Sequence, residues 1–248
     1  GLAMVAIQPP DQFPLTFYRT NPADIHVGIE DIKATPIAES RALLLSGTAL
    51  SRGRVREATL YAAEQARAHH VTTFVDLDLR PDQWAHPLAY GVMMRALLPL
   101  VDVVIGTEEE VWAALDPEPG RVMQGERITA VQKKQVISHI QQLLSTPIGP
   151  QAVVLKESAK GATVYTRDEA PIHAAGYPVE VLNTVGAGDA FASGLIYGRL
   201  HNWNWHKSAR MGNACGAIVV TRHGCAAAMP TEQEALQFAG FLKKKNGD

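Results

Sequence analysis

Four short apolar runs alternate with amphipathic segments through the middle of the chain. Between the runs, apolar residues recur at helical spacing, over residues 51–69, 88–98 and 128–144. A short apolar run bounded by turn residues is typical of a strand that is buried on both faces. Strands and helices in alternation predict an α/β fold with a mostly parallel central sheet and helices on both faces. The runs are residues 42–46, 71–77, 101–105 and 152–155.

The composition fits one large globular domain and argues against several classes of partner. The chain has 248 residues, of which 46% are hydrophobic, so it can bury a sizeable core. The net charge of −2 and the aromatic content of 6% argue against a nucleic-acid or membrane partner. No apolar run is long enough to span a bilayer. Cys215 and Cys225 could form a disulfide, but two free thiols in a cytoplasmic protein are the favoured interpretation.

A glycine-rich stretch, NTVGAGDAFASGLIYG, occupies residues 183–198. It follows an apolar run at residues 179–182, and after Asp189 the apolar residues Phe191 and Leu195 recur at helical spacing. We therefore predict a strand, a glycine turn and the N-terminus of a helix.

A helix that begins at such a turn offers unpaired backbone N–H groups and the positive end of its dipole to an anion. Gly186 and Gly188 would let a phosphate approach this backbone closely. Asp189, in the first turn, could accept the proton of an attacking hydroxyl, which together suits phosphoryl transfer. The alternative is a glycine-rich turn in which Asp189 only caps the helix.

The longer string decides between these interpretations, because NTVGAGDAFASG resembles the C-terminal signature of the ribokinase-like (PfkB) sugar kinases. Three further strings support the resemblance, which runs from residue 1 to about residue 230: VDLDLRPDQW, LLPLVDVVIGTEEE and NACGAIVVTRHGC. The resemblance implies a ribokinase-like fold and an enzyme that uses ATP and Mg²⁺. It also implies that Asp189 is the catalytic base and that the amides of Gly186, Ala187 and Gly188 form the anion hole.

Within the family, the chain is most similar to the kinases of keto-deoxy sugar acids. The implied reaction transfers the γ-phosphoryl group of ATP to a primary hydroxyl of such an acid. Two alternatives stay open. One is another acceptor in the same family, with 2-dehydro-3-deoxygluconate first and fructose or ribose next, and the other is a non-catalytic protein that binds a nucleotide or a sugar.

Asp76, Asp78 and Arg80 alternate at the end of a predicted strand, so they would project to the same side if the strand continued. Ligand groups gather at the carboxyl ends of parallel strands, and an arginine suits a planar anion such as a carboxylate. The alternative is an Asp–Arg ion pair at the strand end. The resemblance implies that Arg80 binds the substrate, with Asp78 beside it.

Residues 1–20 are predicted to form two short strands joined by a turn at residues 8–13. The resemblance assigns residues 1–35 to the remnant of a small β lid and residues 36–248 to the kinase domain. Tyr18 and Arg19 would then point toward the substrate, although a solvated arginine on a hairpin edge is the alternative. Lid strands in this family often pair between subunits, which implies a possible homodimer.

Compared with the family, the sequence lacks a large N-terminal part that would supply the first sheet strand. We expect that it is a piece of a longer protein or that its numbering begins inside one.

The segment GTEEE, at residues 106–110, carries the expected metal contact. Thr107 can cap a helix whose first turn holds the three glutamates, which explains the charges without any ligand. In the family, a glutamate at the position of Glu109 helps to organise Mg²⁺ and phosphates. Gly106 stands where many members have Asn. Because Mg²⁺ keeps several waters, no dense cage of carboxylates is expected.

The resemblance places the nucleotide beside Lys156, Ser158 and Gly161, and beside Asn213 and Ala217 on a later helix. Ser158 replaces a family glycine, and Asn183 replaces an aspartate that is associated with a monovalent cation. The alternative for Lys156 is a solvated lysine at a strand end. The alternative for the later helix is tight packing by small residues.

Overall fold

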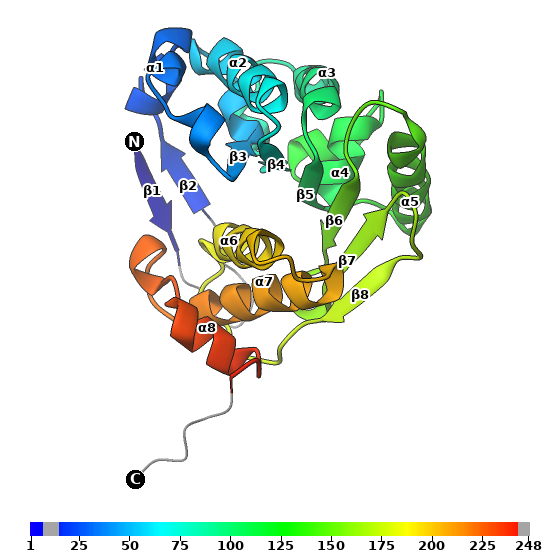
Figure 1. The fold of residues 1–248 in the computed structure, drawn as a ribbon. Coiled ribbons are helices and arrows are strands. Elements are labelled where there is room, and N and C mark those ends of the chain that lie inside the picture. The colour runs from blue at the N-terminus through cyan, green and yellow to red at the C-terminus, as the bar shows by residue number, and fades with distance from the viewer. Residues whose placement is uncertain (7–14, 243–248) are drawn as a thin grey trace. The chain divides into compact units, whose positions relative to one another are not determined.

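The computed structural model describes residues 1–6 and 15–242 (Figure 1). The turn predicted at residues 8–13 lies outside the described residues. The last residues, KKKNGD at 243–248, are predicted from the sequence to form a solvated tail and also lie outside them. The chain divides into two compact units, each of which is described by itself below. The smaller unit comprises residues 1–20, 157–164 and 172–248, and the larger unit comprises residues 21–156 and 165–171. The domain boundary expected near residue 35 stays a prediction.

The six-stranded sheet confirms the predicted α/β fold. Its strand order is β3-β4-β5-β6-β7-β8, with the first four strands parallel to one another and β7 antiparallel to β8. The parallel register places Ser46 opposite Asp76 and Thr107 opposite Lys156, so polar residues gather at the carboxyl ends of these strands. The strands are β3 (Ala42–Ser46), β4 (Thr72–Asp76), β5 (Val103–Thr107), β6 (Ala152–Lys156), β7 (Gly161–Thr166) and β8 (Ile172–Ala175).

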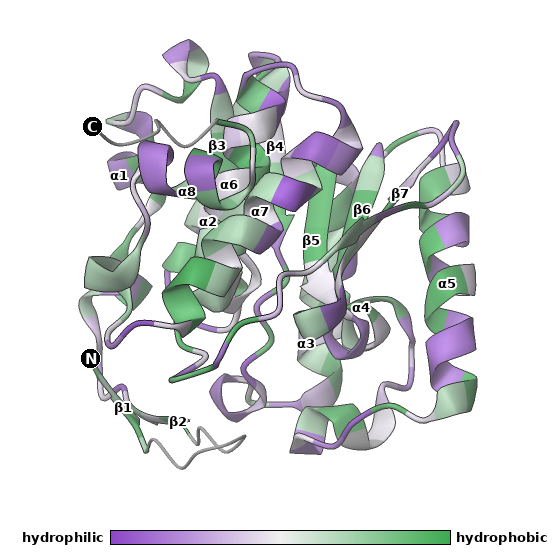
Figure 2. Ribbon diagram, turned by 90° about the horizontal axis from the view of Figure 1, so that it is seen from below, coloured by the Kyte–Doolittle hydropathy of each residue, from purple (hydrophilic) through white to green (hydrophobic). Residues whose placement is uncertain are grey.

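The helices of the larger unit pack along these strands: α2 contacts β3 and β4, α4 contacts β5, and α5 contacts β6. Figure 2 shows β5 as a hydrophobic strand, whereas α5 carries both hydrophobic and hydrophilic residues. One apolar core runs through the unit, with Tyr90, Met94, Leu97 and Ile140 fully buried. The helices are α1 (Ile29–Lys33), α2 (Val55–Ala68), α3 (Pro87–Leu97), α4 (Glu108–Leu115) and α5 (Ala130–Ser145).

Two details of the larger unit differ from the prediction. The sequence predicts that Ser51 caps a helix over residues 51–69, but residues 47–50 form a 3₁₀ turn and α2 begins only at Val55, after Arg54. The strand β3 is not fully buried: Leu44 is exposed, and β3 lies at the end of the described strand order.

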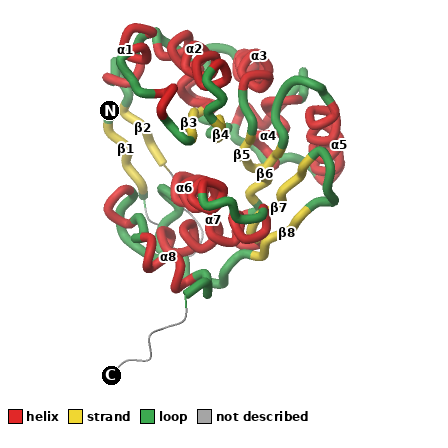
Figure 3. The backbone as a smooth tube through the Cα atoms, viewed as in Figure 1, coloured by secondary structure: helices red, strands yellow, loops and turns green. Residues whose placement is uncertain are grey.

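The described residues of the smaller unit include an antiparallel strand pair and three α-helices. The predicted pair is confirmed as β1 (Leu2–Val5) and β2 (Leu15–Tyr18). Figure 3 shows α6 (Ala187–Leu200) and α7 (Trp205–Val220) side by side, with α8 (Glu232–Phe238) following. A Cβ atom at Gly194 would lie 2.7 Å from the carbonyl oxygen of Met211, so this glycine lets α6 and α7 pack closely.

The strand predicted at residues 179–182 is wrong. The backbone amides of Leu182 and Asn183 donate to the carbonyl oxygen of Val220 at the end of α7, so this segment pairs with a helix terminus instead of a sheet. The sequence predicts a last helix over residues 232–242, capped by Thr231. In the structure this helix is shorter: it ends at Phe238, shortly before Gly240, which has a left-handed φ of +76°.

Candidate active site

The N-terminus of α6 forms as the glycine-rich stretch predicts. Gly186 is the N-cap residue with a left-handed φ of +84°, which favours glycine. A Cβ atom at this position would lie 2.9 Å from Sγ of Cys225. Both the backbone angle and the close approach of Cys225 therefore require glycine here.

The first turn of α6 leaves amides that an anion could use. The amide of Ala187 donates to the carbonyl oxygen of Thr184 at 3.3 Å. Among the described residues, the amides of Gly188 and Asp189 donate to no backbone carbonyl. The side chain of Asp189 is exposed, and no side chain caps α6. The carboxylate of Asp189 is therefore available to a ligand.

Asn183 holds the turn that precedes α6. Its side chain is buried, donates through Nδ2 to the carbonyl oxygen of Arg222 at 2.5 Å, and accepts from the amide of Val185 at 2.9 Å. A neutral amide can donate and accept at once, whereas an ionised carboxylate only accepts. The asparagine thus has a structural explanation within this unit.

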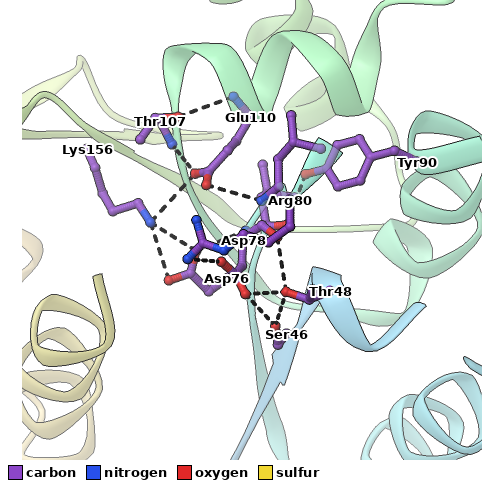
Figure 4. Close-up of polar contacts among 11 residues, drawn as sticks. Ser46, Thr48, Asp76, Asp78, Arg80, Tyr90, Thr107, Glu110 and Lys156 are labelled. Atoms are coloured by element: carbon purple, nitrogen blue, oxygen red, sulfur yellow. Dashed lines mark hydrogen bonds and ion pairs between the residues drawn. The ribbon is translucent and has the colours of Figure 1, made fainter. Parts of the chain in front are cut away.

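In the larger unit, the side chains of Asp76, Glu110 and Lys156 form a buried charged cluster (Figure 4). Nζ of Lys156 lies 3.0 and 3.3 Å from the two carboxylate oxygens of Asp76 and 3.6 Å from Oε2 of Glu110. The alternative of a solvated lysine is therefore wrong.

Burial and charge shift the pKa values in this cluster. Burial raises the pKa of Asp76, the charge of Lys156 opposes this effect, and the charge of Glu110 adds to it. For Lys156, burial lowers the pKa, but the charges of Glu110 and Asp76 outweigh it and hold the pKa above its usual value.

The sequence interpretation missed Glu110. A signal was present, because a capping-box pattern links Thr107 to the third residue after it. In the structure, Thr107 caps α4, as predicted, and the amide of Thr107 donates to Oε2 of Glu110 at 2.7 Å. The carboxylate that completes this cap also faces Lys156.

Asp78 and Arg80 do not continue β4. The strand ends at Asp76, and Asp78 has a left-handed φ of +35°, so the expected alternation to one side is wrong. Nη2 of Arg80 pairs with Oδ1 of Asp78 at 2.9 Å, which is the ion pair considered as the alternative. The hydroxyls of Ser46 and Thr48 donate to Oδ2 of Asp78.

The residues assigned to the nucleotide occupy well-defined backbone positions. Ser158 has a φ of +54°, and Gly161 has a φ of +105°, where a Cβ atom would lie 2.1 Å from the carbonyl oxygen of Ala174. Asn213 is buried and donates from Nδ2 to the same carbonyl at 2.8 Å, so its amide holds the end of β8. Ala217 is buried on α7.

Glu109, Tyr18 and Arg19 complete the predicted site residues. Glu109 is half-buried in the first turn of α4, and Tyr18 is exposed on β2 immediately before Arg19. A Cβ atom at Gly106 would lie 2.7 Å from Cδ1 of Leu77, which accounts locally for the glycine at this position.

Residues 1–6 and 15–242 contain no group of three or more His, Cys, Asp or Glu side chains that could hold a metal ion. None of their helices is long and apolar enough to cross a membrane. Both cysteines are free thiols.

Comparison with known proteins identifies the family. The pattern of the pfkB family carbohydrate kinases matches residues 1–232. The chain belongs to the pfkB family of carbohydrate kinases, which confirms the resemblance carried by the glycine-rich signature.

The chain is also similar to curated proteins that are named for one particular kinase activity. The chain is 34% identical over 238 residues to 5-dehydro-2-deoxygluconokinase 1 of Bacillus cereus and to 5-dehydro-2-deoxygluconokinase of Bacillus anthracis. Each match covers 96% of this chain and 68% of the relative.

Solved structures share the fold. A PfkB protein from Polaromonas sp. JS666 is 26% identical, with a TM-score of 0.67 over 91% of this chain and 68% of that chain. A fructokinase from Vibrio cholerae O395 in a fructose-, ADP- and calcium-bound form is 24% identical, with a TM-score of 0.72 over 96% and 73% of the two chains. A putative ribokinase II from E. coli in complex with ATP and Mg²⁺ is 23% identical, with a TM-score of 0.72 over 97% and 71%.

Proposed function

We propose that this carbohydrate kinase transfers the γ-phosphoryl group of ATP to a primary hydroxyl of a sugar acid, with 5-dehydro-2-deoxygluconate as the first candidate. The names of the most similar curated relatives support this acceptor. Arg80 at the carboxyl end of β4 supports it independently, because a guanidinium binds a carboxylate in a planar, bidentate geometry.

One observation carries the catalytic assignment: Asp189 presents an exposed carboxylate in the first turn of a helix in which, among the described residues, the amides of Gly188 and Asp189 donate to no backbone carbonyl. In the proposed reaction, this carboxylate takes the proton of the attacking hydroxyl. The amides at residues 186–188, together with the dipole of α6, stabilise charge on the transferred group. Ala187 takes part only if its amide leaves the carbonyl of Thr184.

The residues also fit ATP and Mg²⁺. The left-handed Gly186 and the open amides of α6 suit a phosphate group. Glu109 would reach the cation through water, since Mg²⁺ usually keeps several waters and takes few protein ligands. The cation would neutralise charge on the phosphates. The turn at Ser158 and Gly161, with Asn213 and Ala217 on α7, would line the nucleotide.

On the acceptor side, we assign two pairs of residues to the binding of the sugar acid: Arg80 with Asp78 in the larger unit, and Arg19 with Tyr18 in the smaller unit. Acceptors that stay open are 2-dehydro-3-deoxygluconate, which also carries a carboxylate, and fructose or ribose, which do not. A second function class, a non-catalytic binder of a nucleotide or a sugar, predicts ATP binding without turnover. We also propose a cytoplasmic location, which the two free thiols favour, and a homodimer.

The replacement Asp189→Asn tests the catalytic assignment. We expect turnover to fall by about 10²–10⁴-fold, as is typical of a lost general base, while nucleotide affinity stays near that of the wild type. Asp168→Asn, at an exposed aspartate on the turn after β7, is the matched control and should leave turnover unchanged. Near-normal turnover of Asp189→Asn would remove the assigned role.

A further inference from the structure

The Lys156 ammonium joins two carboxylates that come from different elements of the larger unit. Asp76 ends β4, Glu110 lies in the first turn of α4, and Lys156 ends β6. Their side chains are only 12%, 13% and 16% exposed. The ammonium of Lys156 thus compensates the charge of two buried carboxylates, and ions in such surroundings are costly unless they are paired.

Both carboxylates also accept hydrogen bonds from the backbone that leads to Arg80. Oδ1 of Asp76 accepts from the amide of Asp78 at 3.4 Å, and Oε1 of Glu110 accepts from the amide of Leu79 at 3.3 Å. Figure 4 shows the carboxylates of Asp76 and Glu110 between Lys156 and this segment. The positions of residues 78–80 therefore depend on the same two carboxylates that Lys156 contacts: Oδ1 of Asp76 is shared, whereas Glu110 uses Oε1 for the backbone and Oε2 for Lys156.

The segment needs this support because it lies outside regular structure. β4 has ended, and Asp78 has a left-handed φ of +35°, which is unfavourable for a residue other than glycine. Such a conformation persists only where the surrounding contacts fix it. The carboxylate of Asp78 then pairs with Arg80 and so sets the direction of the guanidinium.

Removing the ammonium of Lys156 would take away the positive charge that pairs with the carboxylates of both Asp76 and Glu110. Two like charges in a buried site cannot both stay ionised and in place, so one takes up a proton or turns away. In either case, an acceptor for the Asp78 or Leu79 amide is weakened. The effect would reach Arg80 through the backbone, without any contact between Lys156 and a ligand.

We propose that Lys156 is a positioning residue for the acceptor site: it keeps Asp76 and Glu110 in place, and these hold the turn that presents Arg80 to the sugar acid. The inference rests on the proposed function in one respect, namely that Arg80 binds the carboxylate of the acceptor. It assigns Lys156 a different role from the contact with nucleotide phosphates that the family resemblance implied.

The test compares Lys156→Met with the double variant Asp76→Asn/Lys156→Met, which restores the net charge of the cluster. We expect Lys156→Met to raise the KM for 5-dehydro-2-deoxygluconate by about 10- to 100-fold, the usual scale for a misplaced binding group, with the KM for ATP unchanged. The double variant and Lys156→Arg should recover most of this loss. Lys134→Met, at an exposed lysine on α5, is the control for losing a lysine.

A second readout is independent of catalysis. Hydrogen exchange of the peptide that covers residues 77–80 should be faster in Lys156→Met and return toward the wild-type rate in the double variant. A raised KM for ATP without recovery in the double variant would overturn the proposal in favour of a phosphate contact. Unchanged exchange at residues 77–80 would also overturn it.

The two readouts keep this proposal separate from the proposed function. If the wild-type chain phosphorylates no sugar acid, the function fails, while hydrogen exchange still decides whether Lys156 organises the turn. If Lys156→Met does not fold, the double variant decides: its KM for ATP must match the wild type, and a raised value would overturn the proposal.

Discussion

Replacing Gly186 with alanine separates two reasons for a glycine at the start of α6. The first is backbone strain, because φ at this residue is +84° and a left-handed conformation costs roughly 1–2 kcal/mol for other residues. The second is a close contact, because the new Cβ atom would lie 2.9 Å from Sγ of Cys225, and overpacking typically costs about 1–3 kcal/mol. We therefore expect Gly186→Ala to lower the free energy of unfolding by about 2–5 kcal/mol, the sum of the two components.

Two variants separate the contributions. Gly125 has the same φ of +84°, and a Cβ atom there would meet nothing within 4 Å, so Gly125→Ala measures strain alone. In the background of Cys225→Ala, the Gly186→Ala change should lose its contact component and cost only about 1–2 kcal/mol. The assay is urea unfolding of the four variants beside the wild type. Equal losses for Gly186→Ala and Gly125→Ala, or no recovery in the Cys225→Ala background, would refute the reasoning.

Two further predictions concern ionisable groups. Cys215 is buried and its pKa is raised to about 11, so only about one thiol in a thousand is ionised at pH 8. Mass spectrometry after alkylation should show Cys225 modified first and Cys215 only on unfolding; equal rates would contradict this. The pKa of Lys156 is raised in the folded state, so its stabilising contribution is fully present below the unfolded value of 10.5 and is lost as the pH rises through the folded value. The difference in unfolding free energy between wild type and Lys156→Met should shrink over that range, and a constant difference would count against the ion pairs.

The repeating layout of the larger unit could be predicted from the sequence because each element carries its own pattern. The run at residues 42–46 is β3, and the run at residues 152–155 is β6 without its last residue. Thr107 and Thr231 cap α4 and α8, as predicted, because a capping residue acts through hydrogen bonds to its own helix. Local signals of this kind need no knowledge of distant contacts.

What could not be predicted depends on contacts between distant parts of the chain. The segment at residues 179–182 is as apolar as a strand, but its amides pair with the end of α7. The ion pairs of Lys156 join residues that are 80 and 46 positions away in the sequence, at Asp76 and Glu110. Periodicity gives no sign of such a pairing, since it arises only when the parallel register brings the strand ends to one edge.

In the candidate site, too, the features set by local sequence were predicted, and those set by distant contacts were not. The glycine turn and the first turn of α6 formed as predicted, because glycines and a following helical pattern are local signals. The direction of Arg80 was not predictable, since β4 ends at Asp76 and hydroxyls from the region of β3 hold Asp78 in a left-handed conformation.

The central claim, a kinase that selects a sugar acid, is tested most directly by a panel of acceptors with ATP. The measurement is kcat/KM of the wild-type chain for 5-dehydro-2-deoxygluconate, 2-dehydro-3-deoxygluconate, fructose and ribose. The account predicts that the two carboxylate-bearing acceptors are phosphorylated well, with 5-dehydro-2-deoxygluconate first, and that fructose and ribose are poor substrates. Equal or better turnover of fructose or ribose would contradict the acceptor assignment, and ATP binding without turnover of any acceptor would contradict the catalytic one.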